Sequence, residues 1–580
     1  MQKLRRSIYV RLRILYTNRP LHAFYCSKRD QLSLLTERPT IWLILRIYCW
    51  RALFDRIKLS DNRGRALPII FITMAARTRL ISGYSVKKIE SNVCFWRITR
   101  MISVGRPLYL AFALFIVAAL LPISRTSKAA GSDGVQTCQA PAGEHISQRF
   151  KVAANGENAP AYTAHVLCIS QVSPEQRLDG EAAFASFDMG RQSVSVVVTC
   201  TDPIQSAKLL PLSYGLHPKI SGSTVTFTVK KPGQVTLEVN GDWNNSLHIF
   251  ANPNEADAPV PDDSNVIYYG PGVHVIDPVK VKSGQTVYIA AGAVIYGRAP
   301  ANTYGGPIFD LEGSNIVLRG RGIIDGSLIP KTATYSCSMI VAHGSNIRVE
   351  GVTFRDSGGW NFPIQASTNV KVQNIKIFGY RGNSDGIDIN NSANVDVSDC
   401  FFRTFDDDVV LKSSNLSEPD THNVTAERCV MWNEIAHALS LGAELNVNCE
   451  NIKFSNCDII HDKGREWLLR VYDSGSAAVK NVTFDDIRIE EARRPMSLWI
   501  GKSMWVKGGD QGHIDNIVFS NISSVMPDNG QKLANFVGYD ADHTVNNVRF
   551  ENVKFGGKEI SASDITENQF VNGVTVPTDK

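Results

Sequence analysis

The 580-residue sequence lacks the patterns that mark several common kinds of site. No two cysteines have the spacing CxxC and no His-rich cluster is present, so we expect no zinc site, and no metal ion or other cofactor in the candidate site. No helical pattern of about 10 to 15 residues separates the short strand-like segments described below. This absence argues against a helical or leucine-rich solenoid.

Most of the chain also lacks an excess of basic residues. Of 61 Lys and Arg, about 24 fall within the first 130 residues, against about 5 of the 56 Asp and Glu. The remaining residues therefore carry a net charge of about −14. A nucleic acid is not an expected partner of this acidic part.

An apolar run, PLYLAFALFIVAALLPIS, lies between Arg106 and Arg125 and is followed by Ser-Lys-Ala-Ala-Gly. It predicts a secretory signal peptide over residues 101–130, with export to the periplasm or medium and no membrane attachment after cleavage. An uncleaved membrane anchor is the alternative. Residues 1–100 are Arg-rich and show no clear strand or helix periodicity. This suggests either that the start of the protein has been assigned too far upstream of Met101 or that the segment is an unusual basic leader. An exported protein can hold disulfides, and Cys138 with Cys168 is a possible pair.

One pattern, an Asn followed by alternating apolar and polar residues, recurs through the second half of the chain. Its intervals are 31, 23, 25, 29, 28, 30, 35 and 31 residues, as in a solenoid with one unit per coil. Alternation with period two predicts short strands. We therefore predict an all-β protein whose residues 263–578 form a right-handed parallel β-helix. The repeats begin at Asn315, Asn346, Asn369, Asn394, Asn423, Asn451, Asn481, Asn516 and Asn547.

Two positions within each repeat, the initial Asn and the residue six positions after it, predict which side chains lie in turns and which in the core. Cys400, Cys429 and Cys457 each lie six residues after the repeat's Asn, where other repeats have Val or Ile, so they are expected to be core thiols. The Asn itself is expected to be a turn residue or part of an internal Asn ladder. Ahead of the repeats, residues 131–262 contain the segments SVSVVVTC, TVTFTVKK and VTLEVNG, which predict a β-sandwich ending at a Pro- and Asp-rich linker.

Several chemically active residues have similar offsets from the repeat's Asn. Asp385 lies 16 residues past Asn369, Asp406 and Asp407 lie 12 and 13 past Asn394, and His437 lies 14 past Asn423. Because equal offsets stack in a β-helix, these side chains are predicted to form a short column on one face. Trp360 is expected to extend that column at one end and Arg470 at the other.

Such a column fits cleavage of a glycosidic bond. The reaction needs a protonated carboxyl for the leaving oxygen, a carboxylate to activate water, and an aromatic surface for a sugar. Each part has another interpretation. Asp385 is a common turn residue, Trp360 could be core, His437 alone is uninformative, and the triplet Asp406 to Asp408 could bind a cation or simply be solvated.

The motifs resemble those of the polygalacturonases, family 28 of the glycoside hydrolases, over about residues 265–575. Asn383-Ser384-Asp385-Gly386 is similar to that family's Asn-Thr-Asp-Gly, and Asp406-Asp407 followed by Leu411-Lys412-Ser413 to its paired-Asp motif. Ala436-His437-Ala438 corresponds to Gly-His-Gly, and Arg470-Val471-Tyr472 to Arg-Ile-Lys. Tyr472 thus replaces the Lys that holds a uronate carboxylate, although Arg470 can still bind one.

The dextranase and isopullulanase group, family 49, is also similar, because it places a β-sandwich before the β-helix and uses three Asp residues on adjacent coils. The spacing from Asp385 to Asp406, together with His437 and Arg470, favours family 28. Both resemblances imply an inverting hydrolase of a polysaccharide, pectin-type in the first case and an α-glucan in the second. A polysaccharide lyase or a non-catalytic glycan-binding β-helix would also fit the predicted fold, and a monomer is expected.

The resemblance to family 28 also implies roles for individual residues. Asp406 would be the general acid, Asp385 and Asp407 would hold and deprotonate water, and His437 would orient or tune Asp406. The expected sugar contacts are Asn383, Arg470, Tyr472, Trp360 and Lys412. Asp408 is the least suited of the triplet to catalysis.

Overall fold

The computed structural model describes residues 134–169, 176–298, 306–330, 337–506, 509–527 and 530–577. The chain divides into two units, residues 1–123 and 124–580, and every described residue lies in the second. The predicted leader and signal peptide are outside the described residues. Within the described ranges, no helix has the length and apolarity of a membrane span.

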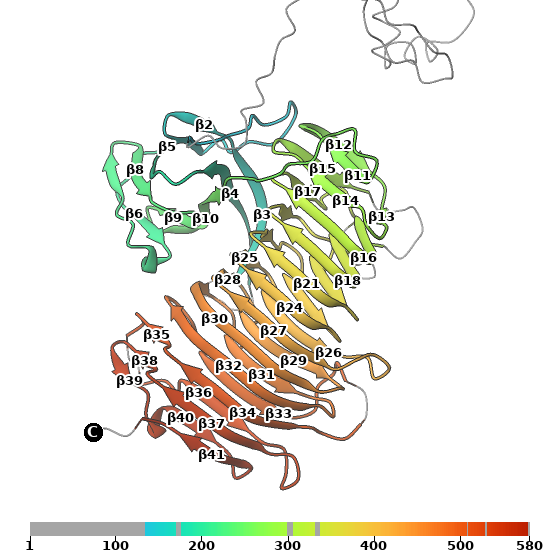
Figure 1. The fold of residues 1–580 in the computed structure, drawn as a ribbon. Helices are drawn as coiled ribbons and strands as arrows, with labels where there is room; N and C mark the ends of the chain where they lie inside the picture. The colour runs from blue at the N-terminus through green and yellow to red at the C-terminus, as the bar shows by residue number, and fades with distance from the viewer. Residues whose placement is uncertain are drawn as a thin grey trace, which may run out of the picture. The chain divides into compact units, whose positions relative to one another are not determined.

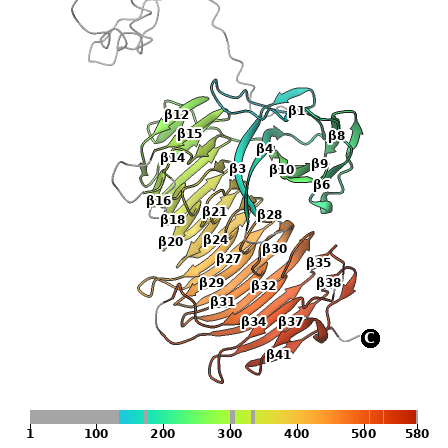
Figure 2. The same ribbon diagram turned by 180° about the vertical axis from the view of Figure 1, so that it is seen from behind.

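Strands β11 to β41 form one continuous sheet of 31 strands that coils into a parallel β-helix, confirming the predicted fold class. Figures 1 and 2 show the coils stacked from the green to the red end of the chain. Each coil contributes strands to three faces, which we call A, B and C, and the chain runs from face C through face B to face A before it turns into the next coil.

Face C carries the candidate site and consists of β13 (Val279–Val281), β20 (Phe362–Gln365), β23 (Ile387–Asn390), β26 (Val409–Ser413), β29 (Leu439–Leu445), β31 (Leu469–Asp473), β33 (Met496–Ile500), β36 (Ala534–Val537) and β40 (Ile565–Glu567). Face B consists of β11 (Val266–Tyr269), β14 (Thr286–Ile289), β21 (Thr368–Gln373), β24 (Ala393–Ser398), β27 (Thr421–Glu427), β34 (His513–Ser520), β37 (Val545–Glu551) and β41 (Val571–Thr575).

Face A consists of β12 (Gly272–Ile276), β15 (Ala293–Gly297), β17 (Ile323–Asp325), β19 (Thr353–Arg355), β22 (Lys376–Phe378), β25 (Phe401–Thr404), β28 (Val430–Asn433), β35 (Ser523–Ser524) and β38 (Lys554–Phe555). Longer strands run through two faces: β16 (Phe309–Gly320) and β18 (Ile340–Glu350) join faces C and B, and β30 (Cys449–Asp462) and β32 (Ala478–Ile489) join faces B and A. The short β39 (Lys558–Glu559) pairs antiparallel with β38, and η4 (Ala562–Asp564) precedes β40.

The interior of the β-helix is a stack of apolar side chains. The alternation seen in the sequence places every second residue inside, where Val, Ile, Leu and Phe from successive coils contact one another. Cys400, Cys429 and Cys457 are fully buried free thiols in this stack, as predicted. Cys457 pairs with Ile487 on the next coil, so the thiols and the aliphatic side chains occupy one row.

The repeated Asn residues lie within strands such as β16 and β18, where the chain bends from face C into face B. Each has a positive φ, near 55°, which Asn tolerates better than most residues. From Asn346 to Asn516, each side-chain amide donates to the side-chain oxygen of the preceding Asn, at 2.7–3.3 Å. Both structural roles are therefore confirmed, but the ladder is exposed rather than internal, because the turn directs it to solvent.

Two five-stranded sheets precede the β-helix and pack face to face as a β-sandwich. The first contains β2 (Glu157–Ala159), β1 (Phe150–Ala154), β5 (Val194–Cys200), β8 (Thr224–Val229) and β7 (Lys219–Ser221). The second contains β3 (Ala161–Ile169), β4 (Arg177–Met189), β10 (Asp242–Pro253), β9 (Gly233–Val239) and β6 (Ala207–Leu210), followed by η3 (Leu212–Tyr214).

The second sandwich sheet is buried on both of its surfaces. One surface faces the sandwich core, and the other packs Phe184 and Phe250 against Phe378, Phe401 and Trp432 of face A. Buried polar groups cross the same contact: Lys376 Nζ donates to Asn252 Oδ1 at 2.5 Å, and Arg403 donates to Ser246 Oγ at 3.1 Å. Figures 1 and 2 both show β3 lying along this side of the coils.

The possible disulfide between Cys138 and Cys168 is not formed, and both residues are free thiols. Cys168 is buried where the sandwich meets face A, beside Asn244 and Arg403. The Cys138 sulfur lies instead against Gly292, where an added Cβ would come within 2.6 Å of it. The prediction was wrong because packing against the β-helix places the two cysteines in different environments.

A buried pair of ion contacts made by Arg355 at this contact generates a stability prediction. Arg355 is 3% exposed, and its guanidinium lies 2.5 Å from Asp325 and 2.7 Å from Glu144 of the sandwich segment. Arg355→Met should lower the free energy of unfolding by about 3–5 kcal/mol, because it leaves two buried carboxylates without a cation. Urea unfolding measures this. The matched Arg549→Met removes an exposed partner of Glu551 and should cost about 1 kcal/mol or less. Equal effects of the two changes would contradict the prediction.

Candidate active site

The turns from face A into face C carry the predicted acids. Asp385 lies just before β23, Asp407 just before β26, and His437 just before β29. Ile387 pairs with Val409 and Val409 with Leu439, so the residues two positions earlier, Asp385, Asp407 and His437, share one register. Backbone bonds maintain it: Gly386 N–H donates to Asp407 O at 2.8 Å and Asp408 N–H to His437 O at 2.9 Å.

Three carboxyl groups meet at this point. One oxygen each from Asp385, Asp406 and Asp407 lies within 4.8 Å of the others. Asp385 and Asp407 are buried, whereas Asp406 is partly exposed and is the acid most open to a ligand. Asp406 Oδ2 accepts the backbone N–H of Asn383 at 3.2 Å, so Asn383 contributes its main chain while its side chain is exposed. Such a trio could also ligate a cation.

Burial and mutual repulsion raise the pKa values of these acids. Burial, then the carboxyl groups of Asp388 and Asp406, raises the pKa of Asp385 well above its ordinary range. Burial, then Asp406, raises the pKa of Asp407 to about 8. Burial also raises the pKa of Asp406, against the opposing effect of Lys412. The cluster therefore retains protons near neutral pH, as a general acid requires.

Lys412 is a counter-ion of the acids rather than an exposed sugar contact. Its side chain is 7% exposed, and Nζ lies 2.8 Å from Asp388 and 3.5 Å from Asp385. The ammonium also lies 3.9 Å from the ring centroid of Trp360, which holds Trp360 at the edge of the cluster. This placement differs from the expected role of Lys412 in binding sugar.

Asp388 is a fourth acid of the cluster that sequence reasoning missed. It is fully buried, and burial raises its pKa to about 6 although Lys412 opposes the shift. The available signal was strand alternation: Ile387 and Ile389 point into the core, which turns Asp388 toward the site face.

His437 is a buried neutral imidazole beside Asp407. Burial, and then Arg470, lowers its pKa well below its ordinary value. Nδ1 donates to the carbonyl oxygen of Trp467 at 2.5 Å, so Nε2 is unprotonated and faces Asp407 Oδ1 at 3.9 Å. The expected partner was Asp406. Trp467, also missed, follows His437 in the same register, because Leu439 pairs with Leu469.

Two polar side chains brace the turn around the acid triplet. Thr404 Oγ1 contacts Asp408 Oδ1 at 2.6 Å, and Asp408 is fully buried. Asn433 Nδ2 donates to the backbone oxygens of Asp406 at 2.6 Å and His437 at 3.0 Å, which joins two successive turns. The buried contact with Thr404 gives Asp408 a role in holding the turn. Asn433 is a further positioning residue that the sequence motifs did not indicate.

Arg470 and Tyr472 lie on face C itself, beyond the turn. Arg470 pairs with Ser440, three positions past His437, so it flanks the column instead of closing it. Among the described residues, no carboxylate lies within 4.0 Å of its guanidinium, and its buried Nε has no hydrogen-bond partner. The guanidinium carbon lies 5.3 Å from the Tyr472 ring, and Tyr472 is only 7% exposed.

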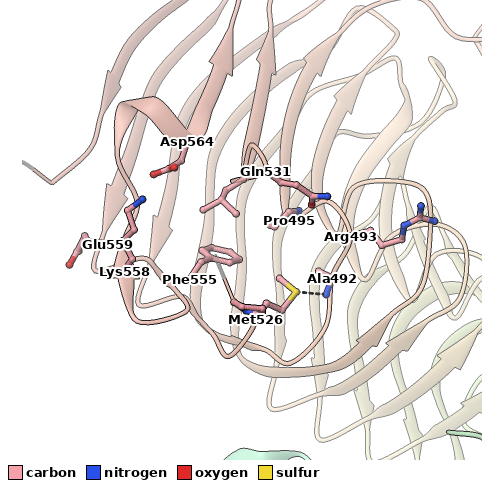
Figure 3. Close-up of a pocket in the computed structure, with 11 residues that line it drawn as sticks. Ala492, Arg493, Pro495, Met526, Gln531, Phe555, Lys558, Glu559 and Asp564 are labelled. Atoms are coloured by element: carbon pink, nitrogen blue, oxygen red, sulfur yellow. Dashed lines mark hydrogen bonds between the residues drawn. The ribbon is translucent and has the colours of Figure 1, made fainter. Parts of the chain in front are cut away.

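A small cavity lies among the C-terminal coils, away from the acid turns in sequence. Figure 3 shows Met526, Phe555 and Pro495 around it, with Met526 Sδ accepting the Ala492 N–H at 2.9 Å. Its volume of about 40 Å³ holds a few waters at most, which is too small for a sugar. The acid turns therefore remain the candidate active site.

Known proteins match this part of the chain. Residues 314–571 match the family model of glycosyl hydrolases family 28. "Exopolygalacturonase clone GBGE184" of Arabidopsis thaliana is 26% identical over 52% of this chain and 73% of its own length. "Exopolygalacturonase B" of Aspergillus niger is 24% identical over 44% of this chain and 64% of its own length. The solved structure of Dex49A from Penicillium minioluteum is 13% identical, with a TM-score of 0.54, and covers 76% of this chain and 96% of its own, which shows a shared fold.

The raised pKa values predict how stability depends on pH. The folded-state pKa of Asp407, about 8, exceeds its ordinary 3.8, so its contribution to stability is full below about pH 4 and is lost as pH rises through 8. Asp407→Asn should flatten the fall in the free energy of unfolding across that window, as measured by urea unfolding at a series of pH values.

Glu491 provides a control of opposite sign. Burial opposes the shift, but His461 and Lys463 lower the pKa of Glu491 to about 2 from 4.5. Its contribution is present above pH 4.5 and lost as pH falls through 2, so Glu491→Gln should change the stability curve only at its acidic end. An unchanged slope between pH 4 and 8 in Asp407→Asn would contradict the prediction.

Proposed function

We propose that the β-helix, whose residues 314–571 match glycosyl hydrolases family 28, is a glycosidase of the polygalacturonase family that hydrolyses a pectin-type polysaccharide containing uronic acids. The observation that carries the choice of sugar is Arg470. It is a half-buried cation, with a buried Nε and no carboxylate partner within 4.0 Å in the described part of the chain. A guanidinium in that position fits the carboxylate of a uronate by a two-bond contact.

The proposed reaction assigns Asp406 as the general acid. It is the most exposed of the three acids, and its raised pKa keeps a proton available for the glycosidic oxygen. Asp385 and Asp407 hold one water, and whichever of the two is ionised accepts its proton as the water attacks the anomeric carbon and the glycosidic bond breaks. Lys412 balances the charge of Asp385 and Asp388, and His437 orients Asp407.

We propose inversion at the anomeric carbon, since two of the three acids remain to activate water. Inverting enzymes hold the acid and base carboxyl groups roughly 6.5–9.5 Å apart, whereas oxygens of all three acids lie within 4.8 Å of one another here, so this spacing does not itself support inversion and the anomer of the product decides. Proton NMR of the first product should show the anomer opposite to the substrate linkage. A first product of retained configuration contradicts this mechanism.

An α-glucan hydrolase of the family 49 type is the second candidate. Two observations favour it: the β-sandwich that packs on the β-helix, and Tyr472 at the position where the polygalacturonase motif has Lys.

A reducing-end assay of the mature protein on polygalacturonate, rhamnogalacturonan, dextran and pullulan separates these candidates. We expect new reducing ends from one or both galacturonate-containing polymers. A signal on dextran or pullulan alone favours the second candidate. Lyase chemistry would instead give an unsaturated product that absorbs in the ultraviolet and is lost in chelator.

The same assay tests the acid. Asp406→Asn should reduce hydrolysis by about 10²–10⁴-fold, because removing a general acid costs roughly that factor. Its melting temperature should stay close to that of the wild type. The matched Asp486→Asn alters an acid bonded to Arg488 on the surface and should keep full activity. Full activity in Asp406→Asn would refute the assignment of the acid.

Export is also part of the proposal, supported by the apolar run before Arg125 and the small residues after it. The mature protein recovered outside the cytoplasm should have an N-terminal mass that begins near residue 131. A mass that begins at Met1 or Met101 contradicts signal cleavage. The expected monomer is checked by sedimentation of the same material.

A further inference from the structure

Face C continues past Arg470 as a row of aromatic side chains that the proposed reaction does not use. Tyr472 on β31 pairs with Trp499 on β33, and Trp499 with Val537 on β36. The Tyr472 and Trp499 rings are parallel, with centroids 4.5 Å apart and an interplanar angle of 5°. The pairing repeats the coil spacing, so the rings stack along the axis of the β-helix.

Tyr472 is enclosed in this row and serves to position its neighbours. Trp499 stacks on its ring, and the guanidinium carbon of Arg470 lies 5.3 Å from the ring centroid. Its hydroxyl donates to the backbone oxygen of Lys502 at 2.8 Å. With 7% of its surface exposed, Tyr472 has little area left for a sugar, which differs from the sugar contact expected from the sequence.

Trp499, in contrast, is open at the surface. It is 42% exposed, although a core tryptophan would be covered. Its second ring face is turned toward the next coil, whose paired residue is the smaller Val537. Gly501 lets the following loop pass close to the indole, because an added Cβ there would come within 2.7 Å of Trp499 Nε1.

A second aromatic residue borders the same spot. Tyr539 is 39% exposed, and its ring centroid lies 5.9 Å from Nζ of Lys502, the residue that follows Gly501. An exposed aromatic pair on the face that carries Arg470 and the acids is continuous with the candidate site. Single exposed apolar residues are common on protein surfaces, but a stacked and braced ring next to a second one is not explained in that way.

We propose that Trp499, braced by Tyr472 and bordered by Tyr539, is a stacking platform for one pyranose ring of the bound polysaccharide. This inference rests on the proposed function. Trp499 lies three coils beyond Asp407, about 14 Å along the axis at one strand spacing per coil, and five residues further along the strand, so the ring that it binds is several sugars from the bond that is cleaved. The indole contacts the C–H face of that sugar, and it selects for chain length on this side of the groove.

The test compares short and long substrates. For Trp499→Ala on oligogalacturonates, we expect KM for the hexamer to rise roughly three- to tenfold, the range given by one aromatic stacking contact, with kcat unchanged. Both constants should stay the same for the dimer, which is too short to span the acids and the platform. Trp499→Phe should recover most of the hexamer affinity. Ile220→Ala, which truncates a 41% exposed side chain on the sandwich strand β7, is the matched control.

Equal losses on dimer and hexamer, or no change on the hexamer, would refute the platform. Binding separates this failure from a failure of the proposed function. If the wild type releases no reducing ends from any of the four polysaccharides, calorimetry with the Asp406→Asn protein and the same polymers replaces kinetics. Adding Trp499→Ala should then weaken binding by the same factor. Unchanged binding, or no binding of any polymer, refutes the platform.

Discussion

The hydrogen-bond ladder between successive coils is the constraint on which the site depends. It continues through the turns that carry the acids, from Asn361 to Asp385 O, Gly386 to Asp407 O, and Asp408 to His437 O. Carboxyl groups within 4.8 Å of one another repel when ionised, and the ammonium of Lys412 offsets only part of that repulsion. The summed pairing of the long sheet holds them, and the raised pKa values record the energetic cost.

The docked sandwich supports this arrangement from behind. Arg403 on β25 contacts Ser246 and His248 of the sandwich and lies 3.6 Å from Glu434, while β25 ends two residues before Asp406. Asn433, next to Glu434, then bonds to the carbonyl oxygens of Asp406 and His437. A chain of buried polar contacts thus connects the sandwich to the acid turns, and removing any member would leave its neighbours unsatisfied.

The sequence predicted what depends on a regular repeat and failed where loops or distant packing decide. The Asn spacing located the coils, and offsets from it brought Asp385, Asp407 and His437 into one register. Arg470 pairs three positions past His437 and not five, as its offset of 19 against 14 suggested, because the chain from Asn451 to β31 is two residues longer than the chain from Asn423 to β29. The pairing of Lys412 with Asp388 and the separation of Cys138 from Cys168 depend on three-dimensional contacts that have no periodic signal.

The second sandwich sheet is buried on both surfaces, so it forms the middle of three packed layers, between the first sandwich sheet and face A of the β-helix. Face A in turn exposes Phe378, Phe401 and Trp432 if the sandwich is absent, and Lys376 and Arg403 lose the hydrogen bonds that they donate to Asn252 and Ser246. Recombination at the linker before Val266 would therefore join incompatible surfaces, even though both halves have regular folds. The two domains are constrained to be inherited together, and substitutions on one side of their contact require compensation on the other.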